Sequence, residues 1–253
     1  MLTKADIKLY RSLLSHHGRK KTGLTICEGL KCCIEIYKTR PDLIRRAFFC
    51  GKNPPKNLFP ELSLEQISKK DMNLISPVIS PQGIIFILKK PYFAKLTELN
   101  FEHTDFLIIL DRIQDPGNMG TIIRTLKAVG INKLFLSFDS ADPFSDKVIR
   151  AATGMQFSMQ IHEYNDLNLL LEELKKIGFK NVFLSDVSKG ENIFKISELF
   201  HKSILLFGNE GSGLPSIING KRFSIPMPGG IDSINVAQAL TITVFEAVRR
   251  KLV

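Results

Sequence analysis

The chain has 253 residues, 44% of them hydrophobic and 24% charged, with a net charge of +10. These shares argue against a disordered or fibrous chain, and the length predicts one large domain or two ordinary ones. No apolar run approaches the roughly 18 residues of a membrane span, and residues 1–6 lack the apolar segment of a signal peptide, which favours a cytoplasmic protein without membrane attachment.

The N-terminal segment has the pattern of a small α/β unit. Apolar residues at a helical period predict a first helix that ends at Gly18, followed by a basic patch at residues 19–21. A Pro-Gln-Gly turn at 81–83 leads into an apolar strand. In chain order, the expected elements are a helix over 4–17, a strand over 24–27, a helix over 28–39, a strand over 44–50, a helix over 63–70 and a strand over 84–88.

Residues 91–104 are polar, lack a clear period and are interpreted as a linker between domains 1–90 and 105–253. In the second domain, strands rich in Leu, Ile and Phe alternate with helices, which predicts an α/β fold with a parallel sheet covered on both faces. The expected elements are strands over 106–110, 133–137, 182–185 and 204–207 and helices over 118–129, 167–177 and 235–250.

The positive charge is unevenly distributed between these segments. Residues 1–105 contain 18 Lys and Arg against 10 Asp and Glu, whereas the remaining residues contain 17 and 15. A basic segment joined to a nearly neutral one indicates that the first segment binds a polyanion, with nucleic acid as the first candidate. Ordinary surface lysines are the alternative that a net charge leaves open.

The four cysteines lie at positions 27, 32, 33 and 50, which is too sparse for a disulfide scaffold. They form no Cys-x-x-Cys pair, and no His has the spacing that completes a zinc site. We interpret them as thiols of a reduced core and expect no metal site.

Three loops follow strands of the second domain, where ligands of parallel α/β sheets bind. The first motif loop, residues 111–125, reads DRIQDPGNMGTIIRT. Its Pro-Gly pair sets a turn, and Asn118 is the expected cap of the next helix, whose free N–H groups suit an anion. Arg124 follows six residues later. A well-capped helix with a surface arginine is the simpler interpretation of this loop alone.

The second motif loop, residues 208–215, reads GNEGSGLP, and its glycines let a ligand approach the backbone closely. It is neither Gly-x-Gly-x-x-Gly nor a phosphate loop, which counts against a nicotinamide-dependent oxidoreductase and a nucleoside triphosphatase. The third motif loop, residues 225–240, reads IPMPGGIDSINVAQAL and leads into the last helix. Alone, the second loop equally fits a flexible connection. Each of the three loops has an ordinary explanation by itself, but the ordered trio indicates one site.

In this order the three motif loops resemble those of the SpoU branch of the SPOUT superfamily, the TrmH-like RNA ribose 2′-O-methyltransferases. The resemblance covers about residues 105–250. Residues 1–90 also resemble the L30e-like substrate-binding domain of ribosomal RNA members, on residues 25–29 (TICEG) and 80–84 (SPQGI). This second resemblance favours ribosomal RNA over transfer RNA as the substrate.

The resemblance implies an enzyme that transfers a methyl group from S-adenosyl-L-methionine to a ribose 2′-hydroxyl in RNA, most of all 23S ribosomal RNA. It further implies a SPOUT-type parallel sheet with a trefoil knot, an L30e-like N-terminal domain and a homodimer. Nothing in periodicity or composition predicts the knot or the dimer.

The resemblance also assigns site residues, without a metal. The implied catalytic residues are Asn118, Arg124, Glu210, Ser233 and Asn235. The implied cofactor-binding residues are Gly208, Asn209, Gly211, Ile225, Met227, Ile234 and Asn235. Arg124 is implied to lie nearest the hydroxyl. Because a guanidinium has a pKa above about 12, we interpret Arg124 as a phosphate ligand that stabilises a forming alkoxide, rather than as a base.

One departure from the family pattern lies in the third motif loop. The family commonly has Ser-Leu-Asn-Val-Ser, whereas residues 233–237 of this chain read SINVA. The change removes one hydroxyl at the start of the last helix. Three alternatives remain: a transfer RNA methyltransferase, a catalytically silent RNA-binding protein of the same fold, and a dinucleotide-dependent oxidoreductase.

Overall fold

The computed structural model describes residues 2–186, 190–209, 211, 213–215 and 218–252. The chain forms two compact units. Unit 1 comprises residues 1–92 and 142–158, and unit 2 comprises residues 93–141 and 159–253. Segment 142–158, which the sequence analysis placed in the second domain, therefore belongs to unit 1. Several contacts hold it there. Thr25 Oγ1 donates to Phe144 O (2.7 Å), Arg40 Nη1 donates to Phe157 O (3.1 Å), and Arg19 pairs with Asp142 (2.8 Å).

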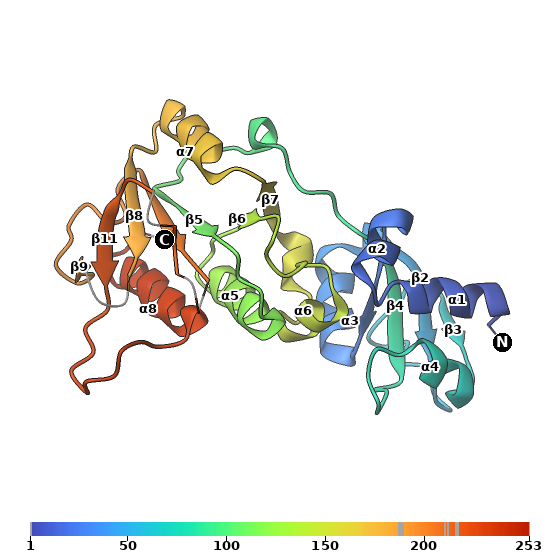
Figure 1. Ribbon diagram of the computed structural model, residues 1–253. Helices are drawn as coiled ribbons and strands as arrows, with labels where there is room; N and C mark the ends of the chain where they lie inside the picture. The colour runs from blue at the N-terminus through green and yellow to red at the C-terminus, as the bar shows by residue number, and fades with distance from the viewer. Residues whose placement is uncertain (1, 187–189, 210, 212, 216–217, 253) are drawn as a thin grey trace. The chain divides into compact units, whose positions relative to one another are not determined.

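Unit 1 is built on a four-stranded mixed sheet of order β1-β4-β2-β3. Strands β1 and β2 are antiparallel to β4, and β3 is parallel to β2 (Figure 1). The elements are α1 (Lys4–Ser12), α2 (His16–Thr22), β1 (Leu24–Glu28), α3 (Leu30–Thr39), η1 (Pro41–Leu43), β2 (Ile44–Phe49), β3 (Leu64–Gln66), α4 (Lys69–Ile75), β4 (Ile84–Lys89), α6 (Asp146–Ala151) and η3 (Met155–Ser158).

Two expectations for unit 1 are wrong. The helix expected over 4–17 is two helices, because Ser15 starts α2 by accepting a hydrogen bond from Gly18 N (3.0 Å). Gly18 lies inside α2 rather than ending a helix, and a Cβ there would meet Ser12 O at 1.9 Å. The helix expected over 63–70 is strand β3 followed by α4, which Ser68 caps.

Unit 2 contains a seven-stranded sheet of order β7-β6-β5-β10-β8-β11-β9, in which every pairing is parallel (Figure 1). Its elements are η2 (Leu96–Glu98), β5 (Phe106–Leu110), α5 (Pro116–Ala128), β6 (Lys133–Ser137), β7 (Gln160–Tyr164), α7 (Leu167–Lys176), β8 (Asn181–Ser185), β9 (Glu191–Asn192), β10 (Ser203–Phe207), β11 (Lys221–Ser224) and α8 (Val236–Arg249).

Helices cover both faces of this sheet, as the sequence predicts. Alternate strand residues, such as Leu107 and Ile109 of β5, pack with α7 in one buried cluster. Helices α5 and α8 contact each other and lie on the opposite side of the sheet from α7 (Figure 1). The α/β class with a parallel sheet is thus confirmed, whereas the trefoil knot stays a prediction.

Helix α5 begins differently from the sequence expectation. Its cap is Asp115, whose carboxylate accepts from Asn118 N at 2.7 Å, and Pro116 occupies the first helical position. This follows the usual preference for Asp at the cap and Pro just inside the helix. The expectation that Asn118 caps the helix is therefore wrong, which leaves its side chain available for contacts elsewhere.

Candidate active site

The three motif loops meet because of the strand order. Strands β5, β10, β8 and β11 are neighbours and parallel, so their carboxyl ends share one edge of the sheet. The first motif loop follows β5, the second follows β10 and the third follows β11. The end of β8, at Ser185 and Asp186, lies between the second and the third.

Arg112 joins the first and second motif loops. Its backbone is left-handed, with φ of 56°, and its carbonyl accepts from Asn209 Nδ2 at 2.9 Å. Its guanidinium donates to the buried Asp111 at 2.9 Å and to Gly213 O at 3.0 Å. Asp111 also accepts from Tyr164, whose pKa is raised by burial and by the Asp111 charge. Sequence analysis missed Arg112, which no pattern signalled.

The third motif loop is tied to the first by two amide side chains. Asn235 Nδ2 donates to Asn118 Oδ1 at 2.8 Å, while Asn235 Oδ1 accepts from Ala237 N at 2.8 Å and so caps α8. Below them, the hydroxyls of Thr125 and Thr241 are 3.2 Å apart between α5 and α8. The two predicted Asn residues are thus brought together.

A pocket of about 580 Å³ lies among these loops. This volume falls in the usual range of small-molecule sites, roughly 300–1,000 Å³. The described residues that line it are Ser185, Asp186, Gly208, Asn209, Gly211, Gly213, Leu214, Arg222, Ser233, Ile234, Asn235, Val236 and Ala239.

Most of the predicted cofactor residues line this pocket, and two do not. Gly208, Asn209, Gly211, Ile234 and Asn235 are among the lining residues, as is the predicted catalytic Ser233. Ile225 and Met227 are absent from the described lining. Glu210 lies outside the described residues.

Arg124 stands apart from the pocket. It is exposed on α5, and it is not among the described lining residues. Within the described part of the chain it makes no ion pair. Its guanidinium is therefore open to an anion from another molecule.

Sequence analysis missed Ser185, Asp186, Leu214 and Arg222. Ser185 and Asp186 end a predicted strand, so the rule that ligands bind at carboxyl strand ends could have found them. Arg222 lies on β11, a four-residue strand that the apolar pattern did not reveal.

The pocket residues fit an adenosyl cofactor. The second motif loop folds tightly, since a Cβ on Gly208 would meet Gly213 C and Leu214 at 2.8 Å. Gly213 N also donates to Asn209 O at 2.9 Å across an isolated β-bridge. Gly208, Gly211 and Gly213 line the pocket without side chains, so a base or ribose can approach the backbone of the pocket wall closely. No group of three His, Cys, Asp or Glu able to hold a metal occurs among the described residues.

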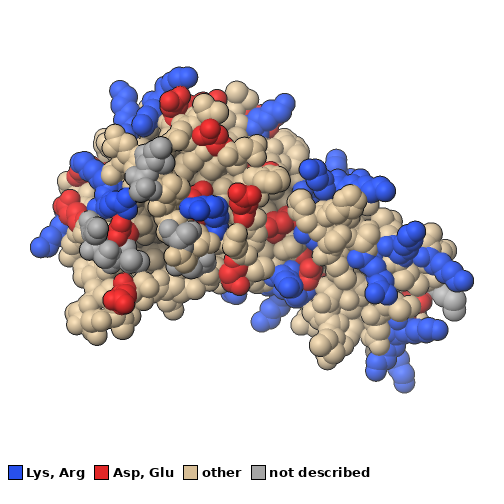
Figure 2. Space-filling model, in the orientation of Figure 1, with Lys and Arg blue, Asp and Glu red and all other residues tan. Residues whose placement is uncertain are grey.

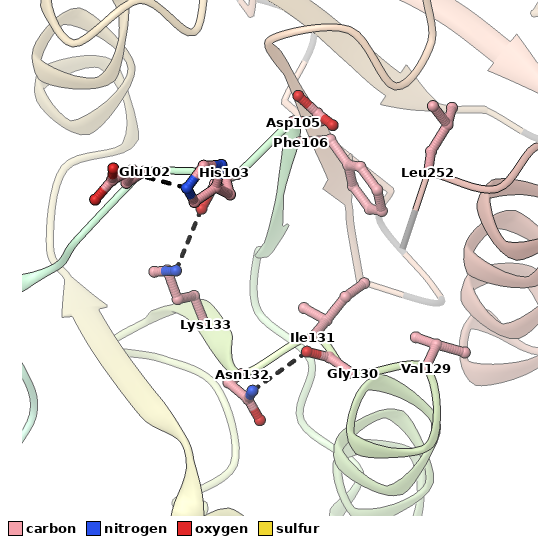
Figure 3. A pocket seen from close by; sticks show the side chains of 11 residues that line it. Glu102, His103, Asp105, Phe106, Val129, Gly130, Ile131, Asn132, Lys133 and Leu252 are labelled. Carbon is pink, nitrogen blue, oxygen red and sulfur yellow. Dashed lines mark hydrogen bonds and ion pairs between the residues drawn. The ribbon is translucent and has the colours of Figure 1, made fainter.

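A second pocket of about 250 Å³ lies at the opposite edge of the same sheet, at the amino ends of β5 and β6 (Figure 3). It contains no motif residue. Lys133 donates to Thr104 Oγ1 (3.2 Å), and burial lowers the pKa of its ammonium group. Of these two pockets, only the first is lined by motif residues.

Comparison with known proteins identifies the family. Residues 105–245, more than half of the chain, match the SpoU rRNA Methylase family. The chain belongs to this family. It is accordingly a methyltransferase that uses S-adenosylmethionine, and the oxidoreductase alternative is excluded.

Relatives match nearly the whole chain. The chain is 28% identical over 245 residues to the 23S rRNA (guanosine(2553)-2′-O)-methyltransferase RlmP of Bacillus subtilis, covering 94% of each. An AdoMet-bound rRNA methyltransferase from Sinorhizobium meliloti has a TM-score of 0.81 at 27% identity, covering 99% of this chain and 96% of that one. The SpoU methyltransferase AviRb from Streptomyces viridochromogenes has a TM-score of 0.85 at 22% identity, which supports the fold alone.

No helix within the described residues is both long and apolar enough to span a bilayer.

Proposed function

We propose that the chain methylates a ribose 2′-hydroxyl of 23S ribosomal RNA. The observation that carries the proposal is that the second and third motif loops line one pocket. The first motif loop is tied to the second through Arg112 and to the third through the hydrogen bond between Asn118 and Asn235. RlmP, which resembles the chain along nearly its full length, is named for this reaction.

The share of the chain that its relatives match favours ribosomal RNA over transfer RNA as the substrate. The rRNA relatives named above match at least 94% of this chain. By contrast, a structure described for 2-OH methylation of C/U34 on tRNA covers only 58% of it, with a TM-score of 0.52 and 25% identity, while 97% of that shorter chain is matched. That tRNA enzyme therefore has no counterpart to much of this chain.

Unit 1 is proposed to bind the RNA, as an L30e-like substrate domain would. It contains 19 Lys and Arg against 9 Asp and Glu, while unit 2 contains 16 of each. The whole net charge therefore belongs to unit 1, and Figure 2 shows Lys and Arg side chains over its surface with few acidic ones. Such a surface attracts phosphates without reading sequence.

The proposed chemistry needs alignment and charge stabilisation. The cofactor supplies a methyl group on a positively charged sulfur. The 2′-hydroxyl is a very weak acid, so the site has to lower the cost of its alkoxide and hold it in line. We assign Arg124 to an RNA phosphate beside the hydroxyl, and Asn118, Glu210, Ser233 and Asn235 to the polar wall around the reacting atoms.

A homodimer would complete this site. Arg124 lies outside the described pocket lining, so a second chain could bring the RNA side of the site to it. The last helix and the residues after it expose Phe245 (50%), Val248 (38%) and Leu252 (37%) at helical spacing. An apolar stripe of this kind suits association with a second copy.

We also propose that the protein acts in the cytoplasm. All four cysteines are free thiols, and three of them are buried, which suits a reducing compartment.

Mapping ribose methylation in cells with and without this protein tests the function. One 2′-O-methyl group should disappear from 23S ribosomal RNA and return when the gene is restored. Loss of a transfer RNA site instead would assign the other substrate. An unchanged map, together with no heat on calorimetric titration with S-adenosylmethionine, would favour the silent RNA-binding protein.

A further inference from the structure

The proposed cofactor pocket has an ion pair in its wall. Arg222 Nη1 donates to Asp186 Oδ2 at 2.6 Å. The two are the charged residues among the described pocket lining. Asp186 follows β8, and its backbone N–H donates to Phe223 O at 2.9 Å, so neighbouring strands hold both groups in register.

This pair is accessible from the pocket rather than sealed in the core. The Arg222 side chain is 34% exposed, and that of Asp186 is 15% exposed. Within the described part of the chain, the Arg222 guanidinium makes no hydrogen bond besides the one to Asp186, although it carries five N–H donors. The remaining N–H groups of the Arg222 guanidinium can therefore donate to a ligand. Because the guanidinium is planar and can form two parallel hydrogen bonds, a carboxylate is the acceptor that suits it best.

The neighbouring lysine provides a contrast. Lys221 lies next to Arg222 on β11 and pairs with Glu198 at 2.7 Å, in an ion pair that is far more exposed. Successive strand residues point to opposite faces, so Lys221 is directed away from the pocket wall that Arg222 joins. Of the two adjacent cations, Arg222 is therefore the one placed to meet a pocket ligand.

We propose that Asp186 and Arg222 bind the amino-acid end of S-adenosylmethionine, an inference that rests on the proposed cofactor pocket. The ligand's α-carboxylate accepts from the remaining Arg222 donors, and its α-ammonium donates to Asp186. Each protein charge thereby keeps an opposite partner whether or not the ligand is bound. A charged pair in a partly shielded site loses little on binding, because neither ion is left unpaired.

A pair of matched ligands tests this assignment by calorimetry. S-adenosylhomocysteine and 5′-methylthioadenosine are both uncharged at sulfur, but only the first has the amino-acid end. Arg222→Gln should weaken S-adenosylhomocysteine binding by about tenfold or more and leave methylthioadenosine within about twofold. Arg222→Lys should fall between, since it keeps the charge and loses the fork.

Asp186→Asn gives an independent variant, since it keeps a hydrogen-bond acceptor for Arg222. It should also weaken the binding of S-adenosylhomocysteine. An analogue of that ligand without the α-amino group should bind wild type and Asp186→Asn almost equally, because it has no ammonium group to donate to Asp186. Lys221→Gln, which removes the same charge on the other face, is the matched control and should change neither ligand. Methylthioadenosine binding shows that each variant has kept its pocket.

The outcomes separate the two proposals. If wild type binds both nucleosides but Arg222→Gln and Asp186→Asn leave their affinity ratio unchanged, the amino-acid subsite is wrong while the pocket stands. The same unchanged ratio with weakened RNA binding would assign Arg222 to an RNA phosphate. If wild type binds neither nucleoside, the proposed cofactor pocket itself fails.

Discussion

Asn235 uses both ends of its side-chain amide. The oxygen caps α8 through Ala237 N, and the nitrogen reaches Asn118 across to the first motif loop. One residue therefore serves the stability of a helix and the geometry of the site. The two roles are separable, because an aspartate is an equally good cap but has no N–H to donate.

Asn235→Asp should keep thermal stability close to wild type and lower methyl transfer by at least about tenfold, since the new carboxylate faces Asn118 Oδ1 without a donor. Asn235→Ala should lower both, with about 1 kcal/mol of stability lost from the missing cap. Thermal unfolding and single-turnover transfer measure the two effects. Equal losses of stability in both variants would contradict the separation.

Arg124→Ala should reduce methyl transfer by orders of magnitude and leave cofactor affinity within a few-fold. The reason is positional, because Arg124 is exposed on α5 and is not among the described residues of the cofactor pocket. Single-turnover transfer and calorimetry with S-adenosylmethionine measure the two quantities. Lost cofactor binding with normal turnover at saturating cofactor would overturn the phosphate role.

At the scale of elements, α8 is anchored at both ends. Its start is held by Asn235, and its last turns are held by Glu246, whose carboxylate accepts from Arg249 and Arg250 at 2.7 Å. Arg250 also donates to Ile196 O at 2.6 Å. The hydrogen bonds that Glu246 accepts from Arg249 and Arg250 lower its pKa to about 2. Because the folded pKa is below the unfolded one, the stabilisation is complete above about pH 5 and is lost as pH falls.

Glu246→Gln should therefore lower the free energy of unfolding by about 1–3 kcal/mol at neutral pH. The difference in the free energy of unfolding between wild type and this variant should shrink as pH falls from about 5 to about 3. In this range wild-type Glu246 takes up a proton on unfolding, which lowers the stability of the wild type. Urea unfolding across this range measures it. Arg249→Gln, which removes a partner that is 68% exposed, is the control and should cost much less. A gap that is constant with pH would contradict the role of the carboxylate.

The sequence predicts best the elements with long apolar runs. Strands β4, β5 and β10 are found because their faces are buried on both sides, and α7 because its apolar residues recur at a helical period. Strands β3, β7, β9 and β11 are missed because they have two to five residues and include charged ones. Of the site, the motif loops are found. Arg222 is missed because its strand, β11, went unrecognised, and Asp186 is missed although it directly follows the predicted strand β8.

At the scale of the whole chain, unit 1 concentrates the charge and also takes in a distant segment. Deleting the N-terminal residues would remove the partners of residues 142–158, among them Thr25 and Arg19, and would expose the buried Phe144. Such a deletion would test folding rather than RNA binding. Charge variants of the full chain are the better probe.

Replacing Lys20, Lys21 and Lys31 of unit 1 by Gln should weaken RNA binding and flatten the slope of log affinity against log salt. Each lost phosphate contact changes the slope by about 0.7 to 0.9, so three contacts change it by roughly 2 to 3. Replacing the exposed Lys175, Lys176 and Lys180 of unit 2 is the matched control. Salt titrations of wild type and of both variants on one 23S RNA fragment measure these slopes. If the unit 1 variant has the same slope as wild type, unit 1 is only a solvated basic surface.

The most direct test of the central claim is methyl transfer by the purified chain from labelled S-adenosylmethionine, with excess chelator present. The label should enter 23S ribosomal RNA and, after digestion, be recovered as a single 2′-O-methylated nucleoside. A 2′-deoxy substitution at that nucleotide should abolish the incorporation. Label on a base, label on transfer RNA in preference to 23S RNA, or no label in any RNA would contradict the account.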